Sequence, residues 1–167
     1  ADLTIAVMPV PWEEASRFGI ITQDDDEKIL KFSEKPTKPD SNLASMGIYI
    51  FNTDLLVSSL KEDAIDQVSE HDFGKNIIPK LLEQDKRLYT YEFNGFWRDV
   101  GTISSYHETS MDLLGPNPAF DIFCSTFPIM SNASTRPPAF VGKNGNIEDC
   151  LVANGCQIHG TAKHSIL

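Results

Sequence analysis

The feature that most constrains this chain is the alternation of strand-like and helix-like segments along most of its length. Apolar runs rich in β-branched and aromatic residues occupy 3–10, 18–22, 29–32, 46–51 and 88–93. Thr53, Asp72 and Thr102 are suited to cap helices, because apolar residues follow each of them at helical spacing. Strands that alternate with helices predict an α/β fold.

The strand-like runs also carry local detail. The first run ends at Pro9 and Pro11, because proline cannot donate to a sheet ladder. Runs 18–22 and 29–32 flank an acidic turn at 24–27, which predicts a hairpin with a solvated tip; a metal site is the alternative, although the ligand spacing and glycine of a calcium loop are absent. The near-continuous apolar run 46–51 predicts a strand buried on both faces.

The pattern changes from Gly115 onward, where prolines interrupt a stretch without helical or strand period. In the last segment Val152, Ile158 and His164 recur every six residues with small residues between them. This recurrence is typical of a β-helix coil, although a hairpin could show the same spacing. The sequence therefore predicts a first domain at 1–115, a linker at 116–144 and a β-helical segment at 145–167.

Composition excludes several functions. The chain has 24 acidic against 14 basic residues, a formal net charge of −10, and no long basic cluster, so broad binding to nucleic acid or to an anionic membrane is not expected. No apolar run approaches the roughly 20 residues that a membrane span needs. The three cysteines form no C-x-x-C pair, which favours a reducing, cytoplasmic setting and gives no zinc signature.

The ends of the chain suggest a larger parent. The first residues lead directly into an apolar strand-like run, and the last residue stands inside another periodic stretch. We therefore expect this chain to be a fragment of a longer one.

A charged pair follows the second strand of the expected hairpin. Glu34 and Lys35 precede Pro36, which places both charges at the carboxyl end of the strand, where open α/β sheets bind ligands. Lys35 could neutralise a phosphate, and Glu34 could accept hydrogen bonds from sugar hydroxyls. An exposed ion pair before a turn is the alternative. Gly19 would either allow a ligand close to the backbone or form a bend.

A second candidate is Asp99, which follows aromatic residues and precedes a glycine and a helix start. A carboxylate held by stiff backbone suits a magnesium ion that bridges phosphates, because that ion takes one or two carboxylates and keeps several waters. Asp99 could instead cap the next helix. Thr102 is already placed for that role.

Several windows, taken in order, point to a family. They are MPVPWEEASRFG (8–19), FSEKP (32–36), LASMGIYIF (43–51), HDFGKNIIP (71–79), FWRDVGTISSYHETSMDLL (96–114) and LVANGCQIHGTAKHSIL (151–167). Together they strongly resemble bacterial ADP-glucose pyrophosphorylases, also called glucose-1-phosphate adenylyltransferases. The EKP and W-x-D-V-G-T windows occur throughout sugar-nucleotide pyrophosphorylases, whereas the first window joined to ASMGIY and HDFGK selects the ADP-glucose branch.

The resemblance implies a fold. It implies the C-terminal half of a Rossmann-like, mixed-sheet nucleotidyltransferase domain, followed by the first coil of a left-handed parallel β-helix. The family's glycine-rich loop and its first metal-binding aspartate do not occur in these residues. The fragment alone is therefore expected to be inactive.

The resemblance also implies a site. Glucose 1-phosphate is expected at Gly19, Glu34, Lys35 and Ser45, with Lys35 holding the sugar phosphate; Asp99 is expected to hold Mg²⁺. Lys35 and Asp99 would be the catalytic residues.

The implied reaction makes ADP-glucose and pyrophosphate from ATP and glucose 1-phosphate for glycogen biosynthesis. Members of the family are cytoplasmic, allosterically regulated, and commonly homotetramers or mixed tetramers.

Two alternatives remain. One is a non-catalytic regulatory subunit of the same family. The presence of Asp99 together with Glu34 and Lys35 disfavours it, because a non-catalytic subunit has no need for both a metal carboxylate and a phosphate-binding lysine. The other is a sugar-1-phosphate nucleotidyltransferase that uses another nucleotide.

Overall fold

The computed structural model describes residues 1–130, 132 and 135–167. It contains two compact units, Ala1–Asn94 and Gly95–Leu167, and each is described by itself below.

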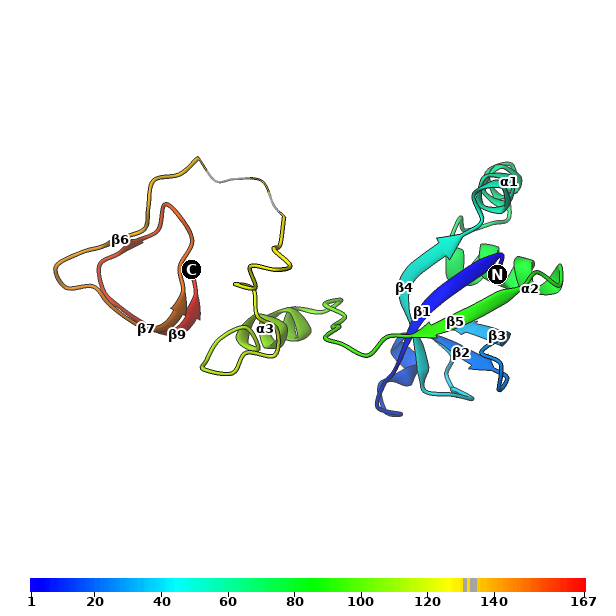
Figure 1. Ribbon diagram of the computed structural model, residues 1–167, viewed down its shortest axis with the longest axis horizontal. Helices are drawn as coiled ribbons and strands as arrows, with labels where there is room; N and C mark the ends of the chain where they lie inside the picture. Colours follow the sequence, from blue (N-terminus) through cyan, green and yellow to red (C-terminus); the bar gives the residue numbers. More distant parts are fainter. Residues whose placement is uncertain (131, 133–134) are drawn as a thin grey trace. The chain divides into compact units, whose positions relative to one another are not determined.

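The first unit is built on a five-stranded sheet in the order β3-β2-β4-β1-β5 (Figure 1). Its strands are β1 (Leu3–Pro9), β2 (Gly19–Gln23), β3 (Ile29–Glu34), β4 (Leu43–Phe51) and β5 (Leu88–Glu92). Only β1 and β5 pair in parallel, and the other neighbours are antiparallel. The sheet is therefore mixed, which confirms the α/β class, and β2 and β3 form the expected hairpin.

Short helices connect the strands of this unit. They are η1 (Ala15–Arg17), α1 (Thr53–Ala64), the single-turn π-helix η2 (Phe73–Ile77) and α2 (Ile78–Glu83). Asp72 caps η2 as expected, since its Oδ1 accepts the Lys75 backbone N–H at 2.9 Å.

The predicted cap of α1 is wrong. Asn52, not Thr53, is the N-cap, because Thr53 is already helical. The Asn52 Oδ1 accepts the backbone N–H groups of Asp54 and Leu55 at 3.1 and 3.3 Å.

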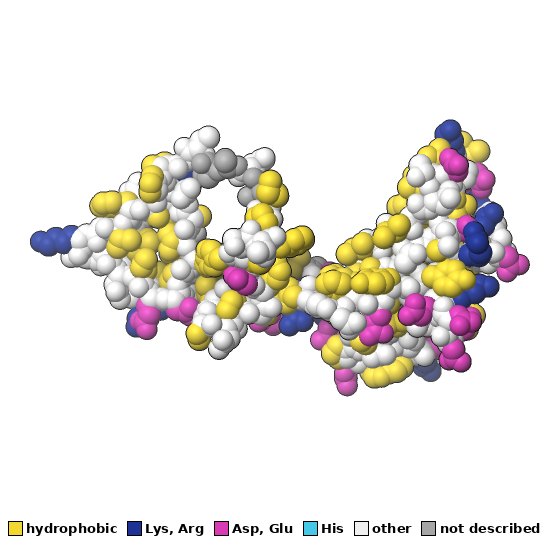
Figure 2. Space-filling model, in the orientation of Figure 1, with side chains coloured by type: hydrophobic (Ala, Val, Ile, Leu, Met, Phe, Trp, Pro, Cys, Tyr) yellow, Lys and Arg dark blue, Asp and Glu magenta, His cyan; other side chains and the backbone are white. Residues whose placement is uncertain are grey.

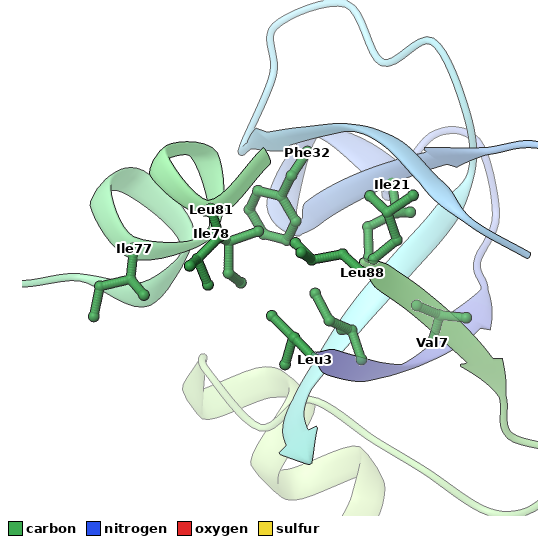
Figure 3. Packing of buried hydrophobic residues seen from close by; sticks show 10 residues of the cluster. Leu3, Val7, Ile21, Phe32, Ile77, Ile78, Leu81 and Leu88 are labelled. Atoms are coloured by element: carbon green, nitrogen blue, oxygen red, sulfur yellow. The ribbon is translucent and has the colours of Figure 1, made fainter. Parts of the chain in front are cut away.

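The larger of two buried hydrophobic clusters in the first unit lies on one face of the sheet (Figure 3). Alternate residues in the first part of β1 are fully buried: Leu3, Ile5 and Val7. Side chains from η2 and α2 close this core, and those buried are Ile77, Ile78 and Leu81. The alternate, inward-facing side chains of β1 thus pack against the apolar face of η2 and α2.

On the opposite face a smaller cluster of Val10, Ala15, Ile20 and Ala44 is buried, but the 46–51 part of β4 is uncovered, so the expected burial of 46–51 on both faces is wrong. Ile48 and Ile50 are 52% and 73% exposed, whereas Tyr49 and Phe51 pack against the core. Ile48 and Ile50 line a shallow apolar depression with side chains from β1 and β5. Hydrophobic side chains are visible at the surface of this unit in Figure 2. An apolar run alone cannot tell which neighbours a strand will receive.

The second unit begins with α3 (Ile103–Met111). Thr102 caps this helix as predicted, and Ser105 completes a capping box with it. The Gly115 backbone N–H donates to Asp149 Oδ1 at 2.9 Å, which ties the end of this region to the later strands. α3 also contacts β9 (Thr161–Ile166). The compact division therefore falls at Asn94, whereas the division predicted at residues 115 and 144 stays a prediction.

Among the residues that the structure describes, four strands follow α3, in two parallel pairs (Figure 1). β6 (Phe140–Val141) pairs with β8 (Gln157–Ile158), and β7 (Asn146–Leu151) pairs with β9. Parallel pairing excludes the hairpin alternative, because hairpin strands are antiparallel. β6 lies inside the predicted linker; residues 131, 133 and 134 of that linker lie outside the described residues.

Within the described residues, none of the helices has both the length and the apolar character required to cross a membrane.

Candidate functional site

The predicted ligand residues of the first unit meet where β2 begins and β3 ends. Gly19 pairs with Glu34 in the antiparallel register of these strands. Lys35 follows directly, with a positive φ of 45°, and its backbone N–H donates to the Phe18 carbonyl at 3.0 Å. The hairpin thus fixes the backbone of both charged residues.

Two glycines leave room for the carboxylate of Glu34. A Cβ atom added to Gly19 would lie 2.8 Å from Glu34 Oε2, and one added to Gly74 would lie 2.6 Å from the same oxygen. Gly19 belongs to β2 and Gly74 to η2, so bare backbone from two elements borders one carboxylate.

Ser45 joins this cluster through Tyr49. Burial raises the pKa of the Tyr49 phenol, a hydrogen bond with Ser45 lowers it, and the carboxylates of Glu34 and Asp72 raise it further. Tyr49 also stacks on Phe73, with ring centroids 5.4 Å apart. The phenol therefore stays neutral at physiological pH, beside two carboxylates, as a donor or acceptor of hydrogen bonds.

The two lysines near the cluster differ in their partners. Lys35 Nζ lies 3.8 Å from Glu34 Oε1, and its side chain is 67% exposed against 24% for Glu34. Lys75 Nζ lies 2.5 Å from Glu70 Oε2, and this hydrogen bond raises the pKa of Lys75. Exposed ion pairs are weak, so the longer contact leaves the Lys35 ammonium available to an incoming anion.

Asp99 belongs to the second unit and is exposed. Because Thr102 is the N-cap of α3, capping does not require Asp99. A Cβ atom added to Gly101 would lie 3.2 Å from Asp99 Oδ2, so glycine leaves room beside this carboxylate too. Among the described residues, no group of three or more His, Cys, Asp or Glu side chains could hold a metal ion. A single exposed carboxylate nevertheless fits Mg²⁺, which takes few protein ligands and completes its shell with water and phosphate.

The structure brings Gly19, Glu34, Lys35 and Ser45 together in one unit, and Asp99 is described separately in the other; the roles of all five stay predictions. The geometry adds neighbours that residue-by-residue reasoning missed: Tyr49, Asp72, Phe73 and Gly74. The windows ASMGIY and HDFGK contain all four. They are distant in sequence from Glu34, and only the fold shows their proximity.

Residues 1–115 match the family model described as nucleotidyl transferase. This match covers more than half of the chain, which therefore belongs to the nucleotidyl transferase family.

Its relatives bear a more specific name. The glucose-1-phosphate adenylyltransferase of Clostridium acetobutylicum is 50% identical over 167 residues, which is 100% of this chain and 44% of that protein. The enzymes of the same name from Acetivibrio thermocellus and Geobacillus stearothermophilus are 47% and 48% identical over the whole chain, which covers 39% and 43% of their lengths. The chain thus spans less than half of each of these relatives.

Proposed function

We propose that this chain forms the sugar-phosphate part of a glucose-1-phosphate adenylyltransferase. The observation that carries the proposal is the cluster in which two glycines border the Glu34 carboxylate, beside an accessible Lys35 and the Ser45–Tyr49 pair. The relatives with that name match the whole chain, which supports glucose 1-phosphate as the ligand.

Each side chain has a chemical role in this proposal. The Lys35 ammonium neutralises the phosphate of the sugar as a point charge, and the Glu34 carboxylate accepts hydrogen bonds from glucose hydroxyls. The Ser45 hydroxyl donates to the sugar or its phosphate. The backbone of Gly19 approaches the ligand closely because no Cβ atom intervenes.

The proposed reaction is an in-line transfer of an adenylyl group. A phosphate oxygen of glucose 1-phosphate attacks the α-phosphorus of ATP, the new P–O bond forms, and the bond to the leaving pyrophosphate breaks. Such transfers need positioning and charge neutralisation more than covalent chemistry from the protein. Lys35 supplies one positive charge and holds the attacking phosphate.

Asp99 is the residue that would hold Mg²⁺. The bound ion would neutralise charge on the phosphates during transfer. The carboxylate of Asp99 would contribute one ligand, and Gly101, which has no Cβ atom, leaves room beside it.

The proposal extends to the second unit and to assembly. The two parallel strand pairs support the start of a left-handed parallel β-helix. We place the enzyme in glycogen biosynthesis in the cytoplasm, as an allosterically regulated homotetramer or mixed tetramer when full length. The 167 residues alone are expected to be inactive, because the glycine-rich nucleotide loop is not among them.

The direct test measures pyrophosphate release by the intact protein, supplied with glucose 1-phosphate and with ATP, UTP or dTTP in turn. Turnover with ATP that is lost in Asp99→Asn, but kept in the control Asp25→Asn on the hairpin turn, supports the proposal. Turnover only with UTP or dTTP identifies a transferase for another nucleotide. No turnover with any of the three favours a regulatory subunit.

A further inference from the structure

The glycine at position 74 has no backbone reason to be a glycine. Positive φ angles among the described glycines occur at Gly47, Gly115 and Gly155, and Gly74 is not among them. Gly74 lies in a helical turn, where glycine costs up to about 1 kcal/mol relative to alanine. It is also buried. The reason for a glycine at position 74 must therefore be the room that it leaves for neighbouring side chains.

The space beside Gly74 belongs to Glu34. A Cβ atom there would meet Glu34 Oε2 at 2.6 Å, Phe32 Cε1 at 3.2 Å and Asp72 Oδ1 at 3.3 Å. Real Cβ contacts are essentially never as short as the first of these distances, whereas the other two require Phe32 and Asp72 to give by only a few tenths of an ångström. The nearest atom is the free end of a flexible side chain. A methyl group at position 74 would therefore move the Glu34 carboxylate before it disturbed the fold.

The surroundings of Gly19, which borders the same carboxylate oxygen, are less adaptable. A Cβ atom added to Gly19 would meet Glu34 Oε2 at 2.8 Å, but also the ring of Phe32 at 2.6 Å, and Phe32 belongs to the buried core. Substitution of Gly19 would thus disturb core and carboxylate together. Gly74 is the position at which the carboxylate can be moved selectively.

We propose that Gly74 is a positioning residue that fixes the orientation of the Glu34 carboxylate toward the bound sugar. The inference rests on the proposed function for the identity of the sugar phosphate. The contact between Gly74 and Glu34 stands on the geometry alone. The role needs no direct contact between Gly74 and the ligand, because Gly74 acts through Glu34.

The experiment is a double-mutant cycle in the intact protein with Gly74→Ala, Glu34→Ala and the double variant. We expect Gly74→Ala to raise the KM for glucose 1-phosphate about tenfold, the magnitude of one lost hydrogen bond to a charged group, while the KM for ATP stays unchanged. In the Glu34→Ala background the same substitution should have no further effect, because the carboxylate that it displaces is gone.

The control is Gly160→Ala. No heavy atom lies within 4 Å of a Cβ atom added to Gly160, so this variant should keep both KM values. Equal effects of Gly74→Ala in the presence and absence of Glu34 would overturn the inference, since they would show a structural role independent of the carboxylate.

Thermal unfolding of the same variants gives a readout that needs no ligand. If Gly74→Ala unfolds at a lower temperature, Glu34→Ala should restore the loss, because it removes the colliding oxygen; a double variant that stays equally destabilised overturns the inference. An intact wild-type protein with no turnover and no calorimetric binding of glucose 1-phosphate refutes the proposed function and the ligand role together. The unfolding cycle still decides whether Gly74 positions Glu34.

Discussion

Lys35 shows how much a single residue can carry in this site. Its ammonium stands at the carboxyl end of β3, 67% exposed and only loosely paired with Glu34. We predict that Lys35→Ala weakens the binding of glucose 1-phosphate by about tenfold or more, because a charge-assisted contact contributes about 1.5–3 kcal/mol. The KM for ATP should change little. Initial rates at varied concentrations of each substrate measure both values.

Lys31, within β3, offers the matched control. Lys31→Ala removes the same single positive charge as Lys35→Ala. Lys31, however, pairs with Asp40 and lies outside the cluster around Glu34. The KM for glucose 1-phosphate should stay at the wild-type value in this variant. A similar rise in both variants would mean that net charge, and not the place of Lys35, governs binding.

At the scale of the elements, the two neighbouring polar residues at the start of α1, Asn52 and Thr53, have different roles. Asn52 Oδ1 accepts two backbone N–H groups, whereas Thr53 is the first helical residue. Asn52→Ala should lower the free energy of unfolding by about 1 kcal/mol, the usual cost of a lost N-cap. Thr53→Ala should cost less. Urea unfolding of the two variants measures both losses in free energy of unfolding. A larger loss for Thr53→Ala would show that Thr53 is the N-cap.

The parallel pair β1 and β5 is joined at one end by Asp2 and Arg87. Arg87 Nη2 donates to Asp2 Oδ1 at 3.0 Å, and the Arg87 backbone N–H donates to Oδ2 at 2.9 Å. The side-chain bond, followed by the backbone bond, lowers the pKa of Asp2 to about 2.

This pKa sets an acid dependence of stability. A carboxyl group with a lowered folded-state pKa stabilises the fold above its ordinary value of 3.8, and this contribution is lost as the pH falls toward about 2. Asp2→Asn should therefore flatten the fall in stability between pH 4 and pH 2. Urea midpoints across this range measure the slope. An unchanged slope, equal to that of Asp25→Asn, would contradict the prediction.

At the scale of the whole molecule, the sheet of the first unit has two unequal faces. Ile5 is fully buried on one face, and Ile50 is 73% exposed on the other. The same change, isoleucine to valine, should cost about 0.5–1.5 kcal/mol at Ile5 and less than about 0.5 kcal/mol at Ile50. Denaturant unfolding of the two variants tests the difference. Equal costs would show that the face bearing Ile50 is covered in solution.

Signals within a few residues predicted much of the fold. The hairpin, the caps at Asp72 and Thr102, and the strand runs all depend on neighbours in the sequence. The exposure of Ile50 depends on which elements cover β4, and the space beside Gly74 depends on a side chain forty positions earlier. Long-range packing decides such features, and periodicity in one sequence does not contain them.

Local sequence also predicted some residues of the candidate site, whereas others depend on long-range packing. Glu34 and Lys35 were predicted from their place at the end of a strand, because chain geometry alone brings charges to a sheet edge. Gly19 and Asp99 were candidates from their local sequence, and the resemblance supplied their roles and added Ser45. Tyr49 was missed because its contacts with Ser45 and with Phe73 of η2 depend on how β4 packs in the fold.

The left-handed backbone of Lys35 has a consequence for how this protein can be improved. A side chain at a φ of 45° costs about 1 kcal/mol or more that glycine would not incur. Lys35→Gly should therefore unfold later than Lys35→Ala while binding sugar phosphate no better. A screen for thermal stability alone would favour replacement of this lysine by glycine. Engineering for heat tolerance should therefore leave Lys35 unchanged, because this position gives up some folding stability in favour of ligand binding.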